Sequence, residues 1–506
     1  MRDEPGEPEG DDTSHSAWAR STGHGIAWST VAFVAARAIS FLSLLVLARL
    51  VAPDAFGVLA AIITFLGFLE LASDLGMRNT VVYEQEHGIT PRVQTAFALN
   101  LGISFALTIL AAAASPLVAA WFRVPDEAWL FALASLNLLF AGLGNVYDGV
   151  LMRGMDFRRR TGPLLARSAV RALVTIPLAV AGLGAEALVI GYLSGTVAWV
   201  AVLWFIAHER IRPRYDAEIA RSMLAYGTGA STLEVLAAIG TAVPALVIGR
   251  TLGSASLGLY TVAQRIPELF IESVAWNVSV VAFPALARRR ATDPDAVSDA
   301  TNGLIRWTVL FATPVAIWIA VLAGPLIYVL LGPEWTGATG VLSALAISEI
   351  FAVAVFPIGD AFKAAGKQRA YIGIQLIAMV VLVGLMVLAS PAGLDAVAWA
   401  RTGQLALFVV AIVFLAQRVL GFHPLGALRA MGPGMAAGVG VFAAAKAVHL
   451  ALPADALGPL VLGTIAAALG GSASLRVLAP DSWRAVRDAL GGLLERVRPT
   501  SPQAAS

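Results

Sequence analysis

The strongest constraint on the fold of this chain is a series of apolar segments, each long enough to cross a bilayer and nearly free of charge. A spanning helix needs roughly 20 mostly apolar residues. The sequence predicts fourteen such helices, at residues 25–48, 55–73, 94–121, 127–150, 164–182, 185–207, 223–249, 256–284, 304–331, 338–361, 370–390, 395–416, 430–451 and 456–478. Only 13% of the residues are charged, against about 25% in soluble domains. We therefore expect an all-α polytopic membrane protein.

Arginine and lysine gather in every second connection between these segments. The connections after helices 4, 6, 8 and 10 hold Arg153, Arg158, Arg159, Arg160, Arg167, Arg210, Arg212, Arg214, Arg221, Arg288, Arg289, Arg290, Arg306, Lys363, Lys367 and Arg369. The connections after helices 5, 9, 11 and 13 hold no basic residue, and those after helices 1, 3 and 7 hold only Arg49, Arg123 and Arg250, each at a helix end. Because cytoplasmic loops carry the excess of Lys and Arg, we expect both termini to be cytoplasmic.

The two ends of the chain differ from the apolar segments. Residues 1–24 are acidic and rich in Gly, Ser and Pro, which predicts a disordered cytoplasmic tail. Within residues 479–506, one face of a predicted helix is apolar and holds Trp483, Val486, Leu490, Leu493, Leu494 and Val497. Arginines take most of the opposite face, which predicts an amphipathic helix on the inner membrane surface. A solvated helical tail is the alternative.

Weak internal repeats divide the membrane part of the chain. Residues recur at spacings of 201 and 212 in corresponding connections, as Arg49 with Arg250, Gly57 with Gly258, Asp148 with Asp360 and Gly154 with Gly366. The repeat predicts two six-helix halves, residues 25–207 and 208–420, related by an axis along the membrane normal around a central cavity. Helices 13 and 14, within residues 421–478, fall outside the repeat and are expected to be an addition.

The stretch from Phe41 to Met77 resembles the opening of the polysaccharide flippase family, the Wzx-type exporters of lipopolysaccharide and exopolysaccharide. The matching residues are Ala48, Arg49, Leu50, Pro53, Phe56, Gly57, Asp74, Leu75 and Gly76. Residues 151–157, 257–265 and 283–286 resemble later segments of the same family. This family is a branch of the MOP superfamily, which also holds the multidrug MATE proteins and the lipid II flippases.

The resemblance implies a flippase that moves undecaprenyl-diphosphate-linked oligosaccharide across the bacterial cytoplasmic membrane by alternating access. Its expected partners are the lipid-linked oligosaccharide and membrane lipid, then a glycan polymerase and glycosyltransferases of the same pathway, with no nucleic acid. A lipid II flippase, a cation-coupled MATE-like drug exporter and a non-transporting scaffold stay open as alternatives.

An enzyme is disfavoured by the sequence. The predicted outer loops are short, and the sequence holds no phosphate-binding Gly-Lys loop, no metal-ligand cluster and no nucleophile–base pair. We therefore expect no catalytic residue, no metal and no cofactor.

Four arginines lie more than one helical turn from either end of a predicted span, where an ionisable side chain is costly and so a candidate for function. They are Arg37, Arg171, Arg265 and Arg401. A guanidinium binds phosphate oxygens in a bidentate way, so these four are candidates for contacting the pyrophosphate of the cargo. Competing interpretations are snorkelling of Arg171 and pairing of Arg265 with Glu268 or Glu272. For Arg401 they are anchoring near the outer surface or pairing with Asp395.

Acidic residues inside or beside the spans form a second group. Glu234 and Glu349 lie in the middle of helices 7 and 10 and are candidates for binding a coupling proton, a sodium ion or sugar hydroxyls. A structural ion pair, such as Glu234 with Arg37, is the alternative. The gate candidates, expected in salt bridges at cytoplasmic helix ends, are Asp74, Asp148 and Asp360.

Small and neutral polar residues predict where helices touch. The pairs Gly191/Gly195 and Gly434/Gly438 are spaced for close helix packing. Asn137 is one of several amides expected to form interhelical hydrogen bonds or to contact sugar.

Overall fold

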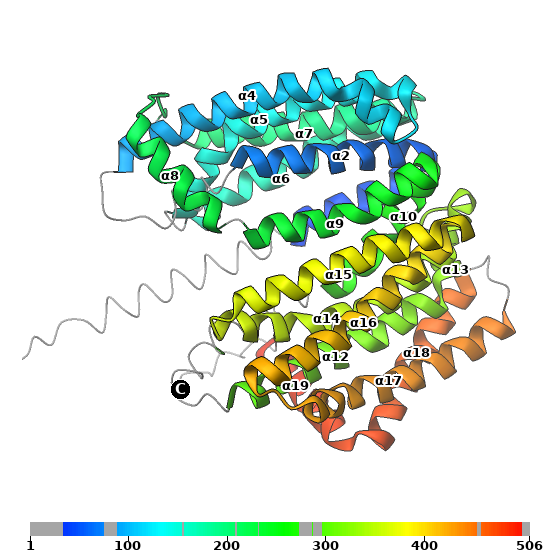
Figure 1. Cartoon of the computed structure of the whole chain (residues 1–506). Helices are drawn as coiled ribbons and strands as arrows, with labels where there is room; N and C mark the ends of the chain where they lie inside the picture. The colour runs from blue at the N-terminus through cyan, green and yellow to red at the C-terminus, as the bar shows by residue number, and fades with distance from the viewer. Residues whose placement is uncertain are drawn as a thin grey trace, which may run out of the picture. The chain divides into compact units, whose positions relative to one another are not determined.

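A computed structural model describes residues 34–74, 89–153, 156–207, 210–230, 232–272, 286, 296–452 and 457–497. The elements in these ranges are helices (Figure 1). Eleven of the described helices are long and apolar enough to cross a membrane, and they coincide with predicted spans 2–6 and 9–14. The shorter apolar helices Val34–Ala48 and Val235–Thr251 overlap predicted spans 1 and 7. The prediction of an all-α polytopic membrane protein is confirmed.

The chain divides into two compact units, Met1–Ala242 (unit 1) and Val243–Ser506 (unit 2). The boundary between them falls within α9 (Thr232–Thr251). The finer division into tails, six-helix halves and an added helix pair stays a prediction.

Unit 1 is a bundle of long helices. It holds the short helix Val34–Ala48 and the start of α9. Between them lie α2 (Pro53–Asp74), α4 (Ile89–Trp121), η1 (Pro125–Glu127), α5 (Ala128–Arg153), α6 (Phe157–Val180), α7 (Ala185–Ile206) and α8 (Ala217–Ala230). Helix α5 packs against α4 and α7, and α7 packs against α6. Helix α2 contacts α4, α5 and α7, which places it against the inner helices of the bundle.

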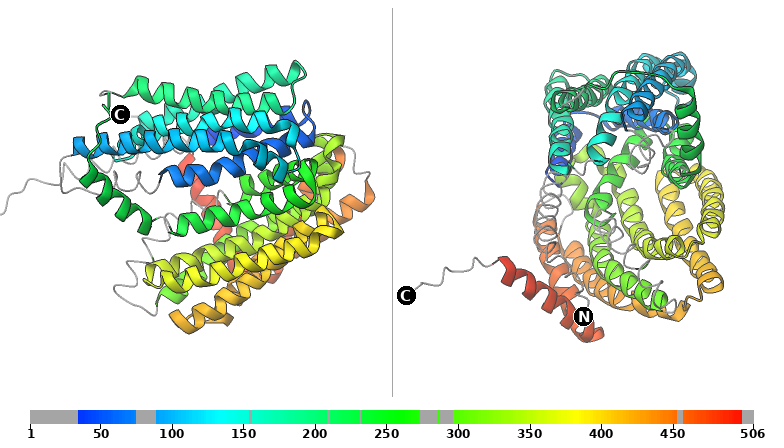
Figure 2. Two further views of the ribbon diagram at one scale, coloured as in Figure 1. Left: turned by 45° about the horizontal axis from the view of Figure 1, so that its top comes forward. Right: turned by 90° about the vertical axis from the view of Figure 1, so that its left-hand side faces the viewer.

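Unit 2 begins within α9 and continues with the helices coloured from green to red in Figure 2. They are α10 (Gly253–Pro267), η2 (Glu268–Glu272), α12 (Ala296–Val321), α13 (Ala323–Leu330), η3 (Pro333–Ala338), α14 (Thr339–Ala364), α15 (Gln368–Ala389), η4 (Ser390–Ala392), α16 (Leu394–Leu420), α17 (Pro424–Ala451), α18 (Leu457–Leu478) and α19 (Pro480–Val497). Helix α14 packs against α12 and α16, and α16 packs against α15.

The packing in unit 2 repeats that in unit 1 after a shift of six spans. The pairs α4–α5, α5–α7 and α6–α7 correspond to α12–α14, α14–α16 and α15–α16. The contacts of α2 with α5 and α7 correspond to those of α10 with α14 and α16. The repeat predicted from residue spacings is therefore present in the packing of spans 2–6 and 8–12. The central cavity stays a prediction.

Glycine allows two helices of unit 1 to approach closely. A Cβ at Gly191 would collide with the Thr175 hydroxyl, and one at Gly195 would lie 2.8 Å from the Arg167 carbonyl oxygen. Both contacts join α7 to α6. This confirms the close packing predicted from the Gly191/Gly195 pair.

Helix α17 uses glycines on two faces, which ties the last two spans to the rest of unit 2. A Cβ at Gly434 would lie 2.6 Å from the Val309 carbonyl oxygen of α12, and one at Gly438 would meet Thr313 and Ile317. On its other face, Gly440 meets the backbone of Gly470 in α18. The predicted Gly434/Gly438 contact is confirmed.

Prolines explain two departures from the predicted helix ends. The predicted span 304–331 is divided at Leu322, with Pro325 in the first turn of α13. Pro325 has no backbone N–H, so it cannot bond the carbonyl of Val321, four residues earlier. Helix α12 ends at Val321. Predicted span 8 starts as α10 but continues after Pro267 as the π-helical turn η2, because the missing N–H again breaks the α-helical ladder.

Candidate functional site

The four arginines predicted to meet the cargo lie on four different helices. Arg37 lies on the short helix Val34–Ala48, and its side chain is exposed in the isolated chain. Arg171 is in α6, Arg265 in α10 and Arg401 in α16. The structure places the last three beside buried polar clusters, one within each unit.

The polar cluster of unit 1 is centred on a carboxylate that the sequence prediction did not include. Glu70, on α2, accepts a hydrogen bond of 2.6 Å from the Asn137 amide of α5. The same amide lies 3.3 Å from the Tyr192 hydroxyl of α7. Asn137 and Tyr192 are buried and Glu70 is half-buried. Three helices therefore meet at a network of polar groups inside the bundle.

Two arginines of α6 flank this network. Arg167 is near enough to interact electrostatically with the Glu70 carboxylate. The Arg171 guanidinium lies 5.4 Å from the centre of the Tyr192 ring, within the range of a cation–π contact. Arg167 makes a similar contact with Trp199 at 5.9 Å. The cluster thus combines one carboxylate, two neutral donors and two cations across α2, α5, α6 and α7.

The polar cluster of unit 2 surrounds Tyr260 of α10, one of the largest fully buried side chains described. Arg401, Glu268 and Glu349 interact electrostatically with its hydroxyl. Glu349, on α14, is buried. Glu268 also accepts hydrogen bonds from Gln264 at 2.6 Å and from Arg265 at 3.2 Å. Arg265 therefore has the local partner that the sequence allowed as an alternative.

The two clusters occupy equivalent helices of the repeat. Asn137 of α5 and Glu349 of α14 stand 212 residues apart, the spacing that also relates Asp148 to Asp360. Each cluster also draws on an equivalent pair of helices, α2 and α7 in unit 1 and α10 and α16 in unit 2. The chemistry differs, because the amide of one unit is replaced by a carboxylate in the other.

Two of the three aspartate gate candidates form salt bridges in the structure. Asp148 is buried and accepts two hydrogen bonds from Arg160, at 2.7 and 2.9 Å. Asp360 is buried and lies 3.2 Å from Lys363 of its own helix. These two form the salt bridges expected at helix ends. The side chains of Asp74 and of Glu234 lie outside the described residues.

We expect Asp148→Ala to lower the stability of the protein in detergent by about 1–3 kcal/mol, because it leaves the bidentate partner Arg160 without its acceptor. Asp488→Ala is the matched control, since Asp488 pairs with Arg487 at 3.2 Å on an exposed surface and such pairs contribute about 0–1 kcal/mol. Thermal unfolding followed by fluorescence-detected size exclusion measures both. Equal midpoints for the two variants would contradict a structural role for the Asp148–Arg160 pair.

Sequence reasoning missed Glu70, Tyr192 and Tyr260 as members of the site. Glu70 stands four residues before the end of α2, where a carboxylate looks like a helix-end group. The tyrosines resemble membrane-interface residues when only the sequence is read. The spacing of 212 residues between Asn137 and Glu349 was a signal that could have drawn attention to both clusters.

Comparison with known proteins places the chain in a family. Residues 46–340, more than half of the 506-residue chain, match the family described as polysaccharide biosynthesis protein. The succinoglycan biosynthesis transport protein ExoT of Rhizobium meliloti (strain 1021) is 26% identical over 65% of this chain and 67% of its own length. The lipopolysaccharide biosynthesis protein WzxC of Escherichia coli (strain K12) is 21% identical over 68% of this chain and 70% of its own.

Solved structures show the same fold in transporters. The lipid II flippase MurJ in an inward closed conformation superposes with a TM-score of 0.74 at 16% identity, over 90% of this chain and 99% of that one. An inward-facing multidrug resistance MATE transporter of the MOP superfamily reaches a TM-score of 0.62 at 16% identity, over 76% and 94%. The match over residues 46–340 shows that the chain belongs to the polysaccharide biosynthesis protein family, and the superpositions show that it has the fold of these transporters.

Proposed function

We propose that this protein moves oligosaccharide linked to undecaprenyl diphosphate from the cytoplasmic to the outer leaflet of the bacterial cytoplasmic membrane, by alternating access, for the synthesis of cell-surface polysaccharide. The observation that carries the proposal is the combination of family membership with a transporter fold. Two relatives, a succinoglycan biosynthesis transport protein and a lipopolysaccharide biosynthesis protein, support a glycan as the cargo. In this proposal both termini are cytoplasmic.

The proposed contacts to the pyrophosphate are Arg37, Arg171, Arg265 and Arg401. Their charge supports this role, since a guanidinium stays ionised and matches phosphate oxygens. The surroundings of Arg171 and Arg265 indicate how they are held between transport steps. Arg171 lies over the Tyr192 ring, and Arg265 is paired with Glu268. Both contacts are weak enough to be exchanged for phosphate oxygens.

The proposed coupling groups are the acidic residues of the spans. Glu349 and Glu234 stay candidates, and Glu70 joins them because its partners Asn137 and Tyr192 are neutral donors on two other helices. Arg167 acts on the Glu70 carboxylate through its charge, but the hydrogen bonds to the carboxylate come from neutral donors, which can stay in place when it accepts a proton or a monovalent cation. Helices α2, α5 and α7 meet at Glu70, so a change in its charge would alter how they pack.

A deletion strain tests the proposed cargo. We expect loss of the gene to abolish the surface polysaccharide and to leave lipid-linked oligosaccharide on the inner leaflet, with recovery when the intact gene is supplied. Glycan staining of the surface and extraction of lipid-linked intermediates measure the two effects. Normal surface glycan with altered drug tolerance would instead indicate a MATE-like exporter, and arrest of cell-wall synthesis would indicate a lipid II flippase.

A further inference from the structure

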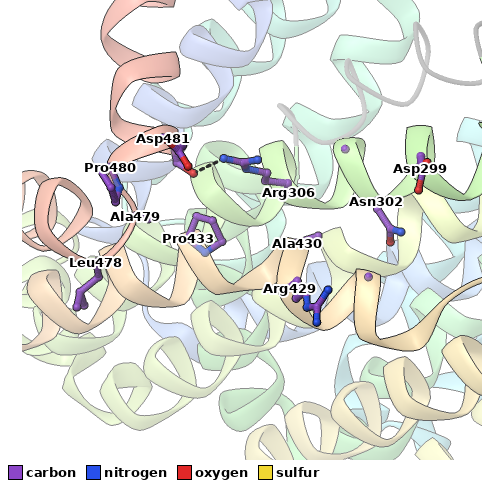
Figure 3. A pocket seen from close by; sticks show the side chains of 13 residues that line it. Asp299, Asn302, Arg306, Arg429, Ala430, Pro433, Leu478, Ala479, Pro480 and Asp481 are labelled. Atoms are coloured by element: carbon purple, nitrogen blue, oxygen red, sulfur yellow. Dashed lines mark hydrogen bonds between the residues drawn. The ribbon is translucent and has the colours of Figure 1, made fainter.

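A cleft of about 530 Å³ opens in unit 2, where the first turns of α12 and α17 meet the junction between α18 and α19 (Figure 3). Helices α12 and α17 begin here and α18 ends here, and all three are candidate membrane spans. The ends of spanning helices lie at the depth of lipid headgroups. The polar residues that line the cleft are Asp299, Asn302, Arg306, Arg429, Asp481 and Ser482.

Half of the charged groups in the cleft are already engaged by neighbours. Arg306 donates a hydrogen bond of 2.6 Å to the Ser482 hydroxyl, which fastens the start of α19 to α12. Asp481 pairs with Arg484 of its own helix at 2.8 Å. Within the ranges covered by the structure, Arg429 and Asp299 have neither an ion pair nor a side-chain hydrogen bond. Arg429 and Asp299 are therefore left for a ligand, and Arg306, whose hydrogen bond goes to a neutral hydroxyl, keeps its positive charge for the same ligand.

The charge pattern selects the kind of ligand. The lining holds two arginines and two aspartates, and because Asp481 is paired with Arg484, the charges that face a ligand are those of Arg306, Arg429 and Asp299. A purely anionic group would satisfy Arg429 but would meet the negative charge of Asp299. A zwitterion with a phosphate and an ammonium a few bonds apart satisfies both, since guanidinium binds phosphate and carboxylate binds ammonium through charge-assisted hydrogen bonds.

Apolar residues beside the cleft indicate that the zwitterion belongs to a lipid. Leu425 and Leu428, in the same turns of α17 as Arg429, are 67% and 68% exposed. Trp307, next to Arg306 on α12, is 48% exposed. In a spanning helix such residues contact acyl chains, and tryptophan favours the level of the headgroups. Polar groups in the cleft and an apolar surface next to it match a phospholipid.

We propose that this cleft binds the headgroup of a phosphoethanolamine phospholipid, with Arg429 and Arg306 at the phosphate and Asp299 at the primary amine. The site is separate from the proposed cargo contacts and goes beyond the proposed function. Through Arg306 and Ser482, the bound headgroup holds the start of α19 at the membrane surface.

Native mass spectrometry of the full-length purified protein tests the site. The protein is delipidated and then titrated separately with phosphatidylethanolamine, phosphatidylcholine and phosphatidylglycerol of the same acyl chains. We expect phosphatidylethanolamine to bind best and Arg429→Ala to weaken it about tenfold, the effect of losing a charge-assisted hydrogen bond. Asp299→Asn should remove the preference for phosphatidylethanolamine over phosphatidylcholine, whose quaternary amine has no N–H to donate.

Arg418→Ala is the matched control, because Arg418 is an exposed arginine in the last turn of α16 and does not line the cleft. It should leave binding unchanged. The proposal is overturned if Arg429→Ala binds lipid as well as Arg418→Ala does. It is also overturned if phosphatidylglycerol binds best and Asp299→Asn does not change that order. Size exclusion of each variant shows that the fold is intact before binding is measured.

Discussion

Replacing Glu70 by Gln is expected to reduce glycan export to about one tenth of the wild-type level or less, while the protein still reaches the membrane in normal amount. Gln keeps the shape of Glu and can still accept the hydrogen bond from Asn137, so the local packing survives. It cannot take up and release a charge, however. If Glu70 carries the coupling proton or cation, the loss is in transport, and an effect of about 1.4 kcal/mol on a transport step corresponds to a factor of ten.

Glu70→Ala separates this role from a structural one. Alanine leaves the buried Asn137 amide without its 2.6 Å acceptor, which costs about 1–3 kcal/mol. A purely structural Glu70 would therefore tolerate Gln and fail with Ala, through loss of folded protein. A coupling Glu70 fails with both, and Gln fails without loss of protein. Surface glycan and immunoblotted membrane protein, measured in the deletion strain with each variant supplied, distinguish the two roles.

Glu218→Gln is the matched control for this experiment. Glu218 is an exposed carboxylate in the first turn of α8, within the same unit. The Glu218→Gln variant changes the same functional group at a position outside the polar cluster, so export should stay at the wild-type level. Export by Glu70→Gln equal to that of Glu218→Gln would remove Glu70 from the proposed coupling groups.

The positions of the spanning helices follow from the sequence because one physical requirement fixes them. Each helix must satisfy its own backbone in lipid, so its length and apolar content are visible in the sequence. Their ends depend on a few local residues, and Pro325 and Pro267 explain the two places where the predicted spans 304–331 and 256–284 differ from the structure. The Gly191/Gly195 contact was predicted because small residues at that spacing serve close packing.

The membership of the polar clusters could not be predicted in the same way. Asp148 was expected in a salt bridge, but its partner Arg160 lies on the next helix, after a connection whose geometry sequence spacing does not give. Glu70 meets Asn137 and Tyr192 only because α2, α5 and α7 converge. Each partner alone has an ordinary interpretation. Glu70, Asn137 and Tyr192 form one polar cluster only when α2, α5 and α7 are packed together.

The contact between α17 and α18 should be among the least tolerant of change in unit 2. A Cβ at Gly440 would collide with the Gly470 carbonyl, and a Cβ at Gly470 would collide with the Gly440 carbonyl. Backbone atoms on both sides cannot move away as a flexible side chain can. Gly440→Ala is therefore expected to destabilise the protein by about 1–3 kcal/mol through overpacking, and Gly440→Leu by more.

Gly432→Ala on the same helix provides the matched control. Gly432 is exposed, and a Cβ there would have no atom within 4 Å. Alanine is a better helix former than glycine by about 1 kcal/mol, so this variant should match or exceed the stability of the wild type. Thermal midpoints of the detergent-solubilised proteins measure the difference. Gly434 and Gly438 join the opposite face of α17 to α12. If Gly440→Ala lowers the thermal midpoint and Gly432→Ala does not, then α17 and α18 unfold together with the other helices of unit 2. Equal midpoints for Gly440→Ala and Gly432→Ala would mean that α18 is loosely attached.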